Sequence, residues 1–600
     1  MHRVQRSIGL LIVSLTIAGM LAACGGSSSP TATTAATKAA AAPTTAAAPT
    51  TGATAATTAP TTAAAAATSP AGSAAAPTTA AAAIPTTAPA GSAVATTPQA
   101  VAGATGGTLT GGFDVGPGGS PKQFYPPTMG AGYVWLEKYF SKLLVYDVGF
   151  TKMQGELAES WTVSADAKTF TFKLRPNVKW HDGMAFTSDD VKFSVELAKN
   201  PDSGNVYQPK YTDIADVATP DPLTAVITTN KPNVALLDAM VFVFMFPKHA
   251  LAAIPTKELE KNPWWTTNPI GTGPYKWSKY VPDQYVELVA NDAYWRGRPK
   301  LDKLINRYFT APGSALIALQ KGEIQFTYVT LDESELVKKD ANLTLIPGPS
   351  QVENDLQCNL KDPRFQDVRV RQAFMYAIDR TTIVDQLFKG AAVTTPCVFD
   401  NPKYLPKDAN PYKRDVNMAK QLLKDANWDS IKGQPIELLT YYGDQLSQDI
   451  LVAIQQQLGD VGIQIKIKAV DVPTFNGFVN KAAPEFTLYY AGAANGADPD
   501  VTSIYFLSTA LPPAGSNRGF FTNADADKYY TAGRSEADTT KRAEDYQNAC
   551  KVLNDQLPWA PMWVTTRFGA VSKSVQNFIY TPSAGSGKYY DQSELWSLAK

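Results

Sequence analysis

The fold class is decided by the stretch Leu446–Ile467, which reads LSQDILVAIQQQLGDVGIQIKI. Its first part, Leu446–Leu458, has the apolar spacing of an amphipathic helix. Gly459 and Gly462 interrupt that spacing, and Ile463–Ile467 then alternates apolar and polar residues as a strand does. A helix that leads directly into a strand is typical of layered α/β proteins. We therefore predict an α/β fold.

Three more segments extend this pattern along the chain. Thr169–Arg175 alternates in the same way and predicts a strand. Ser188, Asp189 and Asp190 supply a helix N-cap and an acidic first turn, so we predict that a helix begins there. Apolar residues at helical spacing run through Asp367–Phe388, which we predict to be one helix.

The charge balance argues against a nucleic-acid partner. The 600-residue chain has 54 Lys plus Arg and 54 Asp plus Glu, without a basic block. Nucleic-acid-binding proteins normally present a clustered positive surface, so we expect no such partner here. The chain also has 11 Trp and 26 Tyr residues. We expect some of these to line a cleft, although core packing explains any single aromatic residue at least as well.

The N-terminus has the features of an export signal. His2, Arg3 and Arg6 precede the apolar stretch Ile8–Ala23. This stretch is too short to cross the roughly 30 Å hydrocarbon core of a membrane comfortably, and it ends in small residues. We therefore predict that residues 1–23 form a signal peptide that is removed.

The segment Leu21–Cys24 resembles the bacterial lipobox. The resemblance implies that Cys24 becomes the lipid-modified first residue of the mature chain and holds the protein on the extracytoplasmic face of the cell membrane. The alternative is an ordinary signal peptide followed by an incidental cysteine. Because the chain has only 4 cysteines and this one stands at the cleavage position, we prefer the lipid anchor.

Residues 24–106 are predicted to form a disordered linker. They consist almost entirely of Ala, Thr, Pro, Ser and Gly, with Lys38 as a single charge. Without large apolar side chains, such a segment cannot offset the roughly 1–2 kcal/mol of backbone entropy that each residue loses on folding. One interpretation is a spacer that holds the globular body away from the membrane. The other is a low-complexity expansion whose length has no function.

The body of the protein carries a series of short motifs in a fixed order. They are Leu157–Trp161, Phe172–Arg175, Val178–Gly183, Phe186–Val191, Gly271–Tyr275, Tyr294–Trp295, Gly322–Ile324 and, most specific of all, Phe365–Phe374. This series resembles family 5 of the solute-binding proteins, the oligopeptide, dipeptide and nickel receptors of ABC importers. The resemblance covers nearly the whole body.

The resemblance implies a two-lobed periplasmic-binding-protein fold of type II, in its large variant with an additional subdomain. Lobe I would then comprise residues 107–155, 267–355 and 567–600, the inserted subdomain residues 156–266, and lobe II residues 356–566. A ligand would be enclosed when the lobes close about the chain segments that connect them.

Two glycine-containing motifs are expected to have structural roles. Gly183 stands in a turn where a positive φ is expected, which residues with a side chain resist. Gly271–Pro274 is expected to be a backbone crossing between lobes, where small residues permit close approach and hinge rotation.

The ligand contacts implied by the resemblance centre on the loop Tyr489–Asp500. In peptide-binding relatives, an aspartate shortly before an acidic-Pro step binds the α-amino group of the peptide. Alignment on Pro499 places Asn495 at that position, and Gly492 where many relatives have tryptophan. Asp498 could substitute for the missing aspartate after a one-turn shift of the loop. Because Asn495 and Gly492 both differ from the residues of the peptide-binding relatives, saccharides and other non-peptide compounds remain alternative ligands.

Further candidate contacts are Tyr125, Tyr207, Tyr489 and Trp563. Tyr125 stands near the place of an Asp-Pro motif, Tyr207 lies in the predicted subdomain, and Trp563 lies on the segment that returns to lobe I. A core-packing role is at least as good an interpretation for each.

Three cysteines remain besides Cys24. Cys358 and Cys397 each adjoin an extended segment, whereas Cys550 lies in a helical pattern. We predict a disulfide between Cys358 and Cys397, although connectivity does not follow from sequence alone.

No motif of a known catalytic type supports an enzyme. The chain lacks Gly-x-Ser-x-Gly, His-Glu-x-x-His and phosphate-binding loop motifs, and only His181 and His249 remain after the signal. We therefore predict a monomeric, non-enzymatic receptor with no cofactor or metal, which binds a small solute or peptide and works with a permease and its ATPase. Two alternatives are an exported hydrolase with paired carboxylates and an adhesin on a stalk.

Overall fold

The computed structural model describes residues 105–115, 124–128, 136–205, 207–479, 481, 483–494, 496–512, 515–579 and 592–599. The predicted signal peptide, Cys24 and nearly all of the predicted linker lie outside these residues, as does Asn495. Within the described ranges, no helix is both long enough and apolar enough to span a membrane.

One large sheet runs through most of the body. Its strands, in spatial order, are β15 (Ile465–Ala469), β14 (Ile436–Thr440), β16 (Leu488–Ala494), β12 (Leu343–Cys358), β17 (Trp559–Ser572), β11 (Phe326–Val329), β1 (Thr108–Asp114), β10 (Lys303–Phe309), β9 (Tyr285–Ala290) and β8 (Tyr275–Val281), with β13 (Ala392–Val393) beside β17.

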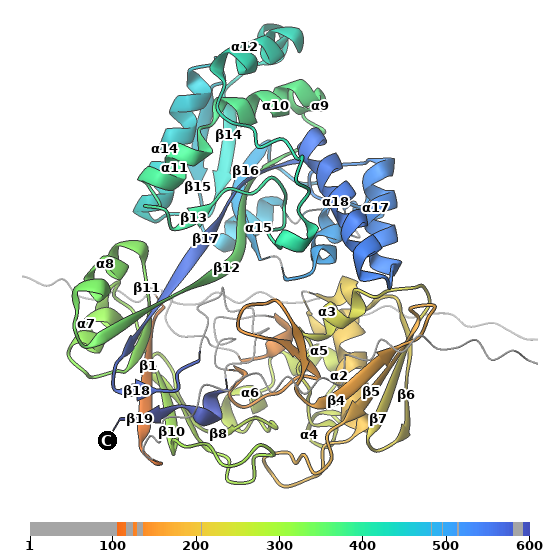
Figure 1. Ribbon diagram of the computed structural model, residues 1–600, viewed down its shortest axis with the longest axis vertical. Coiled ribbons are helices and arrows are strands. Elements are labelled where there is room, and N and C mark those ends of the chain that lie inside the picture. Colours follow the sequence, from red (N-terminus) through yellow and green to blue (C-terminus); the bar gives the residue numbers. More distant parts are fainter. Residues whose placement is uncertain are drawn as a thin grey trace, which may run out of the picture. The chain divides into compact units, whose positions relative to one another are not determined.

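The strands β12 and β17 connect the two halves of this sheet. The first half of β12 pairs with residues 566–572 of β17, and its second half pairs with residues 559–564, with register shifts between the two stretches. Only the second half of β12 also pairs with β16, and only residues 568–571 of β17 pair with β11. Figure 1 shows β12 and β17 as two long strands between the group β14–β16 and the group around β1 and β10. The molecule therefore has two lobes that share two continuous strands.

A separate antiparallel sheet has the order β4-β5-β7-β6. Its strands are β4 (Ala158–Val163), β5 (Thr169–Leu174), β7 (Thr224–Thr229) and β6 (Ile214–Asp221). Two short pairs complete the strands: β2 (Leu144–Tyr146) with β3 (Met153–Gly155), and β18 (Val575–Gln576) with β19 (Ser597–Leu598). The strand predicted at residues 169–175 is β5.

Helices cover both lobes (Figure 1). On the side of the four-stranded sheet they are α2 (Ser188–Lys199), α3 (Leu236–Met240), α4 (Lys248–Leu251), α5 (Thr256–Leu259) and α6 (Trp264–Thr267). The segment between β10 and β12 holds α7 (Ser314–Gln320) and α8 (Leu331–Lys339). Those after β12 are α9 (Pro363–Gln366), α10 (Val368–Ala377), α11 (Arg380–Gln386), α12 (Val416–Asp425), α13 (Trp428–Ile431), α14 (Gln445–Gly459), α15 (Val472–Val479), α16 (Ser503–Phe506), α17 (Ala524–Ser535) and α18 (Thr539–Gln556).

Separate hydrophobic cores lie in the two lobes. One core joins the four-stranded sheet to β1, β8, β9 and β10, with Phe170 and Leu304 among its fully buried members. Another packs α10, α12 and α14 against β12, β14 and β16, with Phe374 and Leu451 buried in it. We name the part around β1, β8, β9 and β10 lobe I, the part around β4–β7 the subdomain, and the part around β14–β16 lobe II.

The predicted helix–strand pair at residues 446–467 is confirmed as α14 and β15. The helix predicted over Asp367–Phe388 is wrong as a single element, because it is two helices. Ile378 after α10 is extended, with φ −90° and ψ 121°, and the Asp379 carboxylate accepts a hydrogen bond from the Thr382 N–H at 3.0 Å. An aspartate that caps a new helix competes with continuation of the old one.

The predicted disulfide is also wrong. Cys397 pairs with Cys550, at a Cα–Cα distance of 5.6 Å, whereas Cys358 is a buried free thiol. Residence in a helix does not prevent a cysteine from pairing, because only the separation and direction of the two side chains matter. Cys358 points from β12 into the core of lobe II, where burial raises its pKa to about 12.

The positive φ expected of Gly183 and the close backbone approach expected at Gly271–Pro274 are confirmed, whereas a crossing between lobes with hinge rotation at Gly271–Pro274 stays a prediction. Gly183 has a φ of +93°. A Cβ on Gly271 would lie 1.6 Å from the Tyr139 carbonyl oxygen, and one on Gly273 would lie 2.7 Å from the Lys138 carbonyl oxygen. Only glycine permits this approach of the two backbone segments.

Candidate ligand-binding site

A row of buried polar side chains lies on one face of β12. Glu353, Asp355 and Gln357 have exposed fractions of 2%, 2% and 0%. Because side chains alternate along a strand, these three point away from Leu356 and Cys358, which belong to the core of lobe II. We call Glu353, Asp355 and Gln357 the polar row.

The polar row contains atoms without hydrogen-bond partners. Within the described part of the chain, neither Asp355 Oδ1 nor the two amide atoms of Gln357, Nε2 and Oε1, has one. Buried polar atoms are nearly always paired, and each unpaired group costs about 1–3 kcal/mol. These atoms are therefore suited to a partner from outside the described chain, such as a bound solute or ordered water.

Aromatic side chains stand on both sides of the polar row. Gln357 is in register with Tyr489 of β16 and with Trp559 of β17. The Tyr489 ring contacts Phe486, with ring centroids 4.9 Å apart, and the Trp559 ring contacts Tyr505 at 5.0 Å. The row therefore forms a polar strip between two apolar walls, an arrangement common in sites for small molecules.

The electrostatic environment is mixed. Burial raises the pKa of the Asp355 carboxyl group well above its ordinary value. Burial also raises the pKa values of Tyr489 and Tyr505, while the nearby Arg518 guanidinium lowers them and the Asp355 charge raises them. The site thus offers a carboxyl group, a primary amide, two phenol hydroxyls and one guanidinium, which suits a solute that carries both amine and acceptor groups.

Tyr489 is the sequence-predicted residue that the structure places at this row. Asn495 lies outside the described residues. Asp498 is buried and bound by Arg542, whose Nη1 lies 2.7 Å from Asp498 Oδ2 and whose Nη2 lies 2.8 Å from Oδ1. Burial would raise the pKa of Asp498, but the Arg542 charge outweighs it and the pKa is lowered. A ligand contact of Asp498 stays a prediction.

Two other predicted residues lie in the cores. Tyr125 is 1% exposed, and its ring centroid lies 4.9 Å from that of Trp265. Trp563 is fully buried on the opposite face of the sheet from the polar row, and it contacts Phe388 at a centroid distance of 5.3 Å. Their roles as ligand contacts stay predictions.

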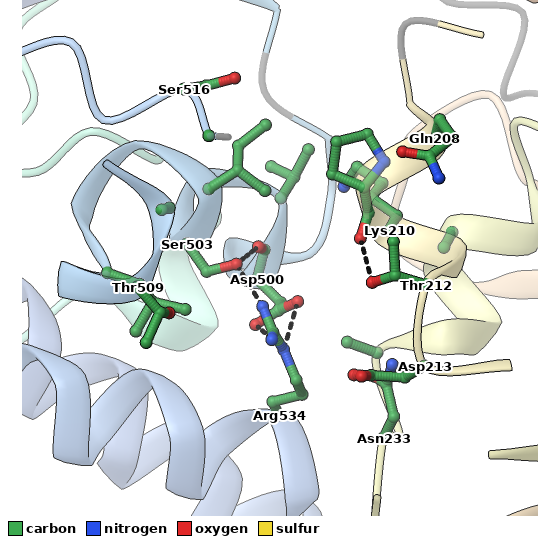
Figure 2. Close-up of a pocket in the computed structure, with 18 of the residues that line it drawn as sticks. Gln208, Lys210, Thr212, Asp213, Asn233, Asp500, Ser503, Thr509, Ser516 and Arg534 are labelled. Atoms are coloured by element: carbon green, nitrogen blue, oxygen red, sulfur yellow. Dashed lines mark hydrogen bonds and ion pairs between the residues drawn. The ribbon is translucent and has the colours of Figure 1, made fainter. Parts of the chain in front are cut away.

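A pocket of about 300 Å³ lies between the subdomain and lobe II. Figure 2 shows Lys210, Asp213 and Asn233 on the subdomain side and Asp500, Ser503 and Arg534 on the lobe II side. Arg534 Nε bonds Asp500 Oδ1 at 3.1 Å, and its Nη2 donates to Ser503 Oγ at 2.6 Å.

The predicted contact Tyr207 lies next to this pocket rather than in its lining. It directly precedes Gln208, Pro209 and Lys210, which line the pocket, and its ring lies 4.2 Å from that of Phe242. Glu353, Asp355 and Gln357 are not among the residues that line this pocket, so the pocket and the polar row are separate places.

Sequence reasoning missed Asp355, Gln357, Tyr505 and Arg518. The alternation of polar residues at 353, 355 and 357 is a visible signal. Taken alone, however, a polar face of a strand indicates exposure to solvent. Tyr505 and Arg518 carry no local signal, because their place depends on how α16 and the loop after it pack.

The two lobes, their two shared strands and the buried polar row define a protein of the solute-binding class. The family model described as bacterial extracellular solute-binding proteins, family 5 Middle, matches residues 152–512. The chain belongs to this family. The predicted two-lobed α/β fold and the predicted function, the substrate-binding component of an ABC importer, are therefore confirmed.

Individual relatives agree with this assignment. A protein of Brucella melitensis, whose name describes an ABC transporter peptide-binding protein, is 45% identical over 82% of this chain and 94% of its own length. The oligopeptide-binding protein AppA from Bacillus subtilis, solved in complex with a nonapeptide, superposes with a TM-score of 0.71 at 26% identity, over 83% of this chain and 100% of its own. NikZ from Campylobacter jejuni, solved in complex with Ni(L-His), superposes with a TM-score of 0.71 at 26% identity. The match covers 82% of this chain and 99% of NikZ.

Proposed function

We propose that the protein captures peptides outside the cytoplasm and delivers them to a membrane permease that a cytoplasmic ATPase drives. The observation that carries the proposal is the polar row, where buried carboxyl and amide atoms lack partners in the described chain between two aromatic walls. The names of the Brucella melitensis and Bacillus subtilis relatives support a peptide ligand.

We further propose that ligand capture closes the lobes about β12 and β17. Lobe I would comprise residues 107–155, 267–355 and 567–600, the subdomain residues 156–266, and lobe II residues 356–566. The change of strand partners near residues 349–353 and 564–566 supports hinge points close to these limits. Closure would bury the ligand and shift the population toward the closed form.

A thermal-shift screen tests the peptide proposal. The purified protein would be mixed with di- to oligopeptides, saccharides, metal chelates and amines. A ligand at a hundred times its Kd adds about 2.7 kcal/mol to the stability of the folded state, which raises the unfolding midpoint visibly. We expect peptides to stabilise the protein and to be recovered unchanged. Stabilisation by saccharides alone would refute the peptide ligand, and turnover of a stabilising compound would favour a hydrolase.

The protein is also proposed to be a monomer that a lipid on Cys24 holds on the extracytoplasmic face of the cell membrane. The lipobox-like segment 21–24 and the Ala/Thr/Pro-rich stretch after it support this proposal. The Cys24→Ala variant is expected to be exported and then found in the soluble fraction, with wild type in the membrane fraction. Membrane retention of the exported variant would refute the anchor.

A further inference from the structure

Two buried carboxyl groups elsewhere in the described chain have several polar partners. Asp190 accepts hydrogen bonds from the Thr187 and Lys248 N–H groups, both at 3.0 Å, and from Trp180 Nε1 at 3.2 Å. Asp498 is held by the Arg542 guanidinium. These groups show how the chain offsets the cost of burying a carboxylate.

Asp355 differs from these two residues. It is 2% exposed, and its Oδ1 has no hydrogen-bond partner in the described ranges. Of its neighbours across the sheet, Ala491 of β16 and Pro561 of β17 offer no side-chain donor. A carboxylate in such a place requires a cation or strong donor, and otherwise stays protonated. Burial accordingly raises the pKa of Asp355, an effect that a bound ammonium group would oppose.

Gln357 adds a second anchor on the same face. Its amide oxygen and nitrogen are both unpaired in the part of the chain that the structure describes. Side chains two residues apart on a strand stand about 7 Å from each other. An extended ligand that runs along β12 can therefore place an ammonium group at Asp355 and a peptide group, with its own donor and acceptor, at Gln357. Tyr489 and Arg518, beside this strip, suit acceptor atoms of the same ligand.

We propose that the Asp355 carboxylate binds the ammonium group of the ligand, which makes a free primary amine, such as the amino end of a peptide, the feature that this site selects. The proposal rests on the proposed peptide-binding function. It assigns to β12 the charge that is absent at Asn495 in the loop before Pro499.

The test compares two peptide libraries on three proteins. The libraries hold random sequences of two to six residues, one with free amino ends and one N-acetylated. The proteins are the wild type, Asp355→Asn, and Asp332→Asn, which removes an equal charge from an exposed residue of α8 that pairs with Lys389. Unfolding midpoints are recorded over a range of library concentrations.

We expect the free library, but not the acetylated one, to stabilise the wild type and Asp332→Asn. Asp355→Asn should need on the order of 30-fold more free library for the same shift, because an unpaired ligand charge costs about 2 kcal/mol or more. An equal response of Asp355→Asn, or equal stabilisation of the wild type by both libraries, overturns the proposal.

Two further outcomes are distinguishable. If the free library does not stabilise the wild type at all, the peptide-binding function fails and the role of Asp355 fails with it. If Asp355→Asn does not fold, equal stabilisation of the wild type by the free and acetylated libraries still overturns the proposal, because it shows that the site does not select a free amine. Without ligand, we expect Asp355→Asn to keep the wild-type midpoint, since it replaces a carboxyl group that burial already disfavours in its charged form.

Discussion

His181 lies between two backbone segments that meet at the Gly271–Pro274 crossing. Its Nδ1 accepts a hydrogen bond from the Gly271 N–H at 3.1 Å, and its Nε2 lies 3.1 Å from the Gly273 carbonyl oxygen. An acceptor at Nδ1 and a donor at Nε2 define the neutral ring. Burial lowers the pKa of His181 to about 4, although the Gly273 carbonyl opposes this shift.

His181 should make stability depend on pH. In the unfolded chain the ring titrates near 6.5, so the unfolded state takes up the proton first as the pH falls. The contribution of His181 is therefore complete above about pH 6.5 and is lost as the pH falls toward 4. We expect a loss of about 1–2 kcal/mol between pH 7.5 and pH 5, measured by urea unfolding. His181→Asn keeps an acceptor but cannot be protonated, and an equal loss in that variant would contradict the assignment.

At the scale of elements, the segment that leads into β8 can approach residues 138–139 because it has glycine at positions 271 and 273. Gly271 and Gly273 precede β8 and lie against the backbone of Lys138 and Tyr139. Hydrogen bonds fasten the contact, since Gly273 N–H donates to the Tyr139 carbonyl at 3.1 Å and Tyr275 N–H to the Lys138 carbonyl at 2.9 Å. The two segments cannot separate without breaking these bonds.

Gly271→Ala should therefore destabilise the protein by about 3 kcal/mol or more, because its Cβ would overlap the Tyr139 carbonyl oxygen. Gly443→Ala is the matched control, since a Cβ there meets nothing within 4 Å, and its effect should stay below about 1 kcal/mol. Urea unfolding of both variants measures the difference. Similar values for the two would show that the backbone near residue 139 yields at little cost.

At the scale of the whole molecule, the subdomain and lobe II contact each other directly. The Val234 N–H donates to the Arg534 carbonyl oxygen at 2.7 Å, and Ser535 Oγ donates to the Pro232 carbonyl oxygen at 3.3 Å. Lys210 of the subdomain and Asp500 of lobe II both line the pocket beside these contacts (Figure 2). Burial lowers the pKa of Lys210, whereas Asp238 and Asp500 raise it.

Lys210→Met should weaken ligand binding without touching the ligand. The variant loses the attraction of Lys210 to Asp500 between the subdomain and lobe II, so the closed form becomes less populated and the apparent affinity falls. We expect a loss of about fivefold, which corresponds to roughly 1 kcal/mol. Lys231→Met is the control, because Lys231 lines the same pocket but pairs at 3.7 Å with Asp213 of its own subdomain. Titration with a peptide from the screen measures the affinity of both variants. Equal affinities of Lys210→Met and Lys231→Met would contradict a role of Lys210 in closure.

Local patterns in the sequence were sufficient for the α/β class, for α14, β5 and β15, and for the positive φ of Gly183. Each of these depends on a few neighbouring residues, because periodicity and glycine conformation are local properties. The break between α10 and α11 is also local, since Asp379 and Thr382 form the cap. The motif series, read in order, was enough to indicate the family.

Properties that join distant parts of the chain needed the folded molecule. Cys397 and Cys550 are 153 residues apart, and the packing of α18 brings them together. In the sequence alone, the alternating polar residues 353, 355 and 357 indicate a strand that faces solvent. In the folded molecule, β16 and β17 lie on either side of this strand and the three side chains are buried. Burial is what turns Asp355 from an ordinary surface carboxyl group into a candidate for the ligand's charge, and burial is a property of the whole fold rather than of its sequence neighbours.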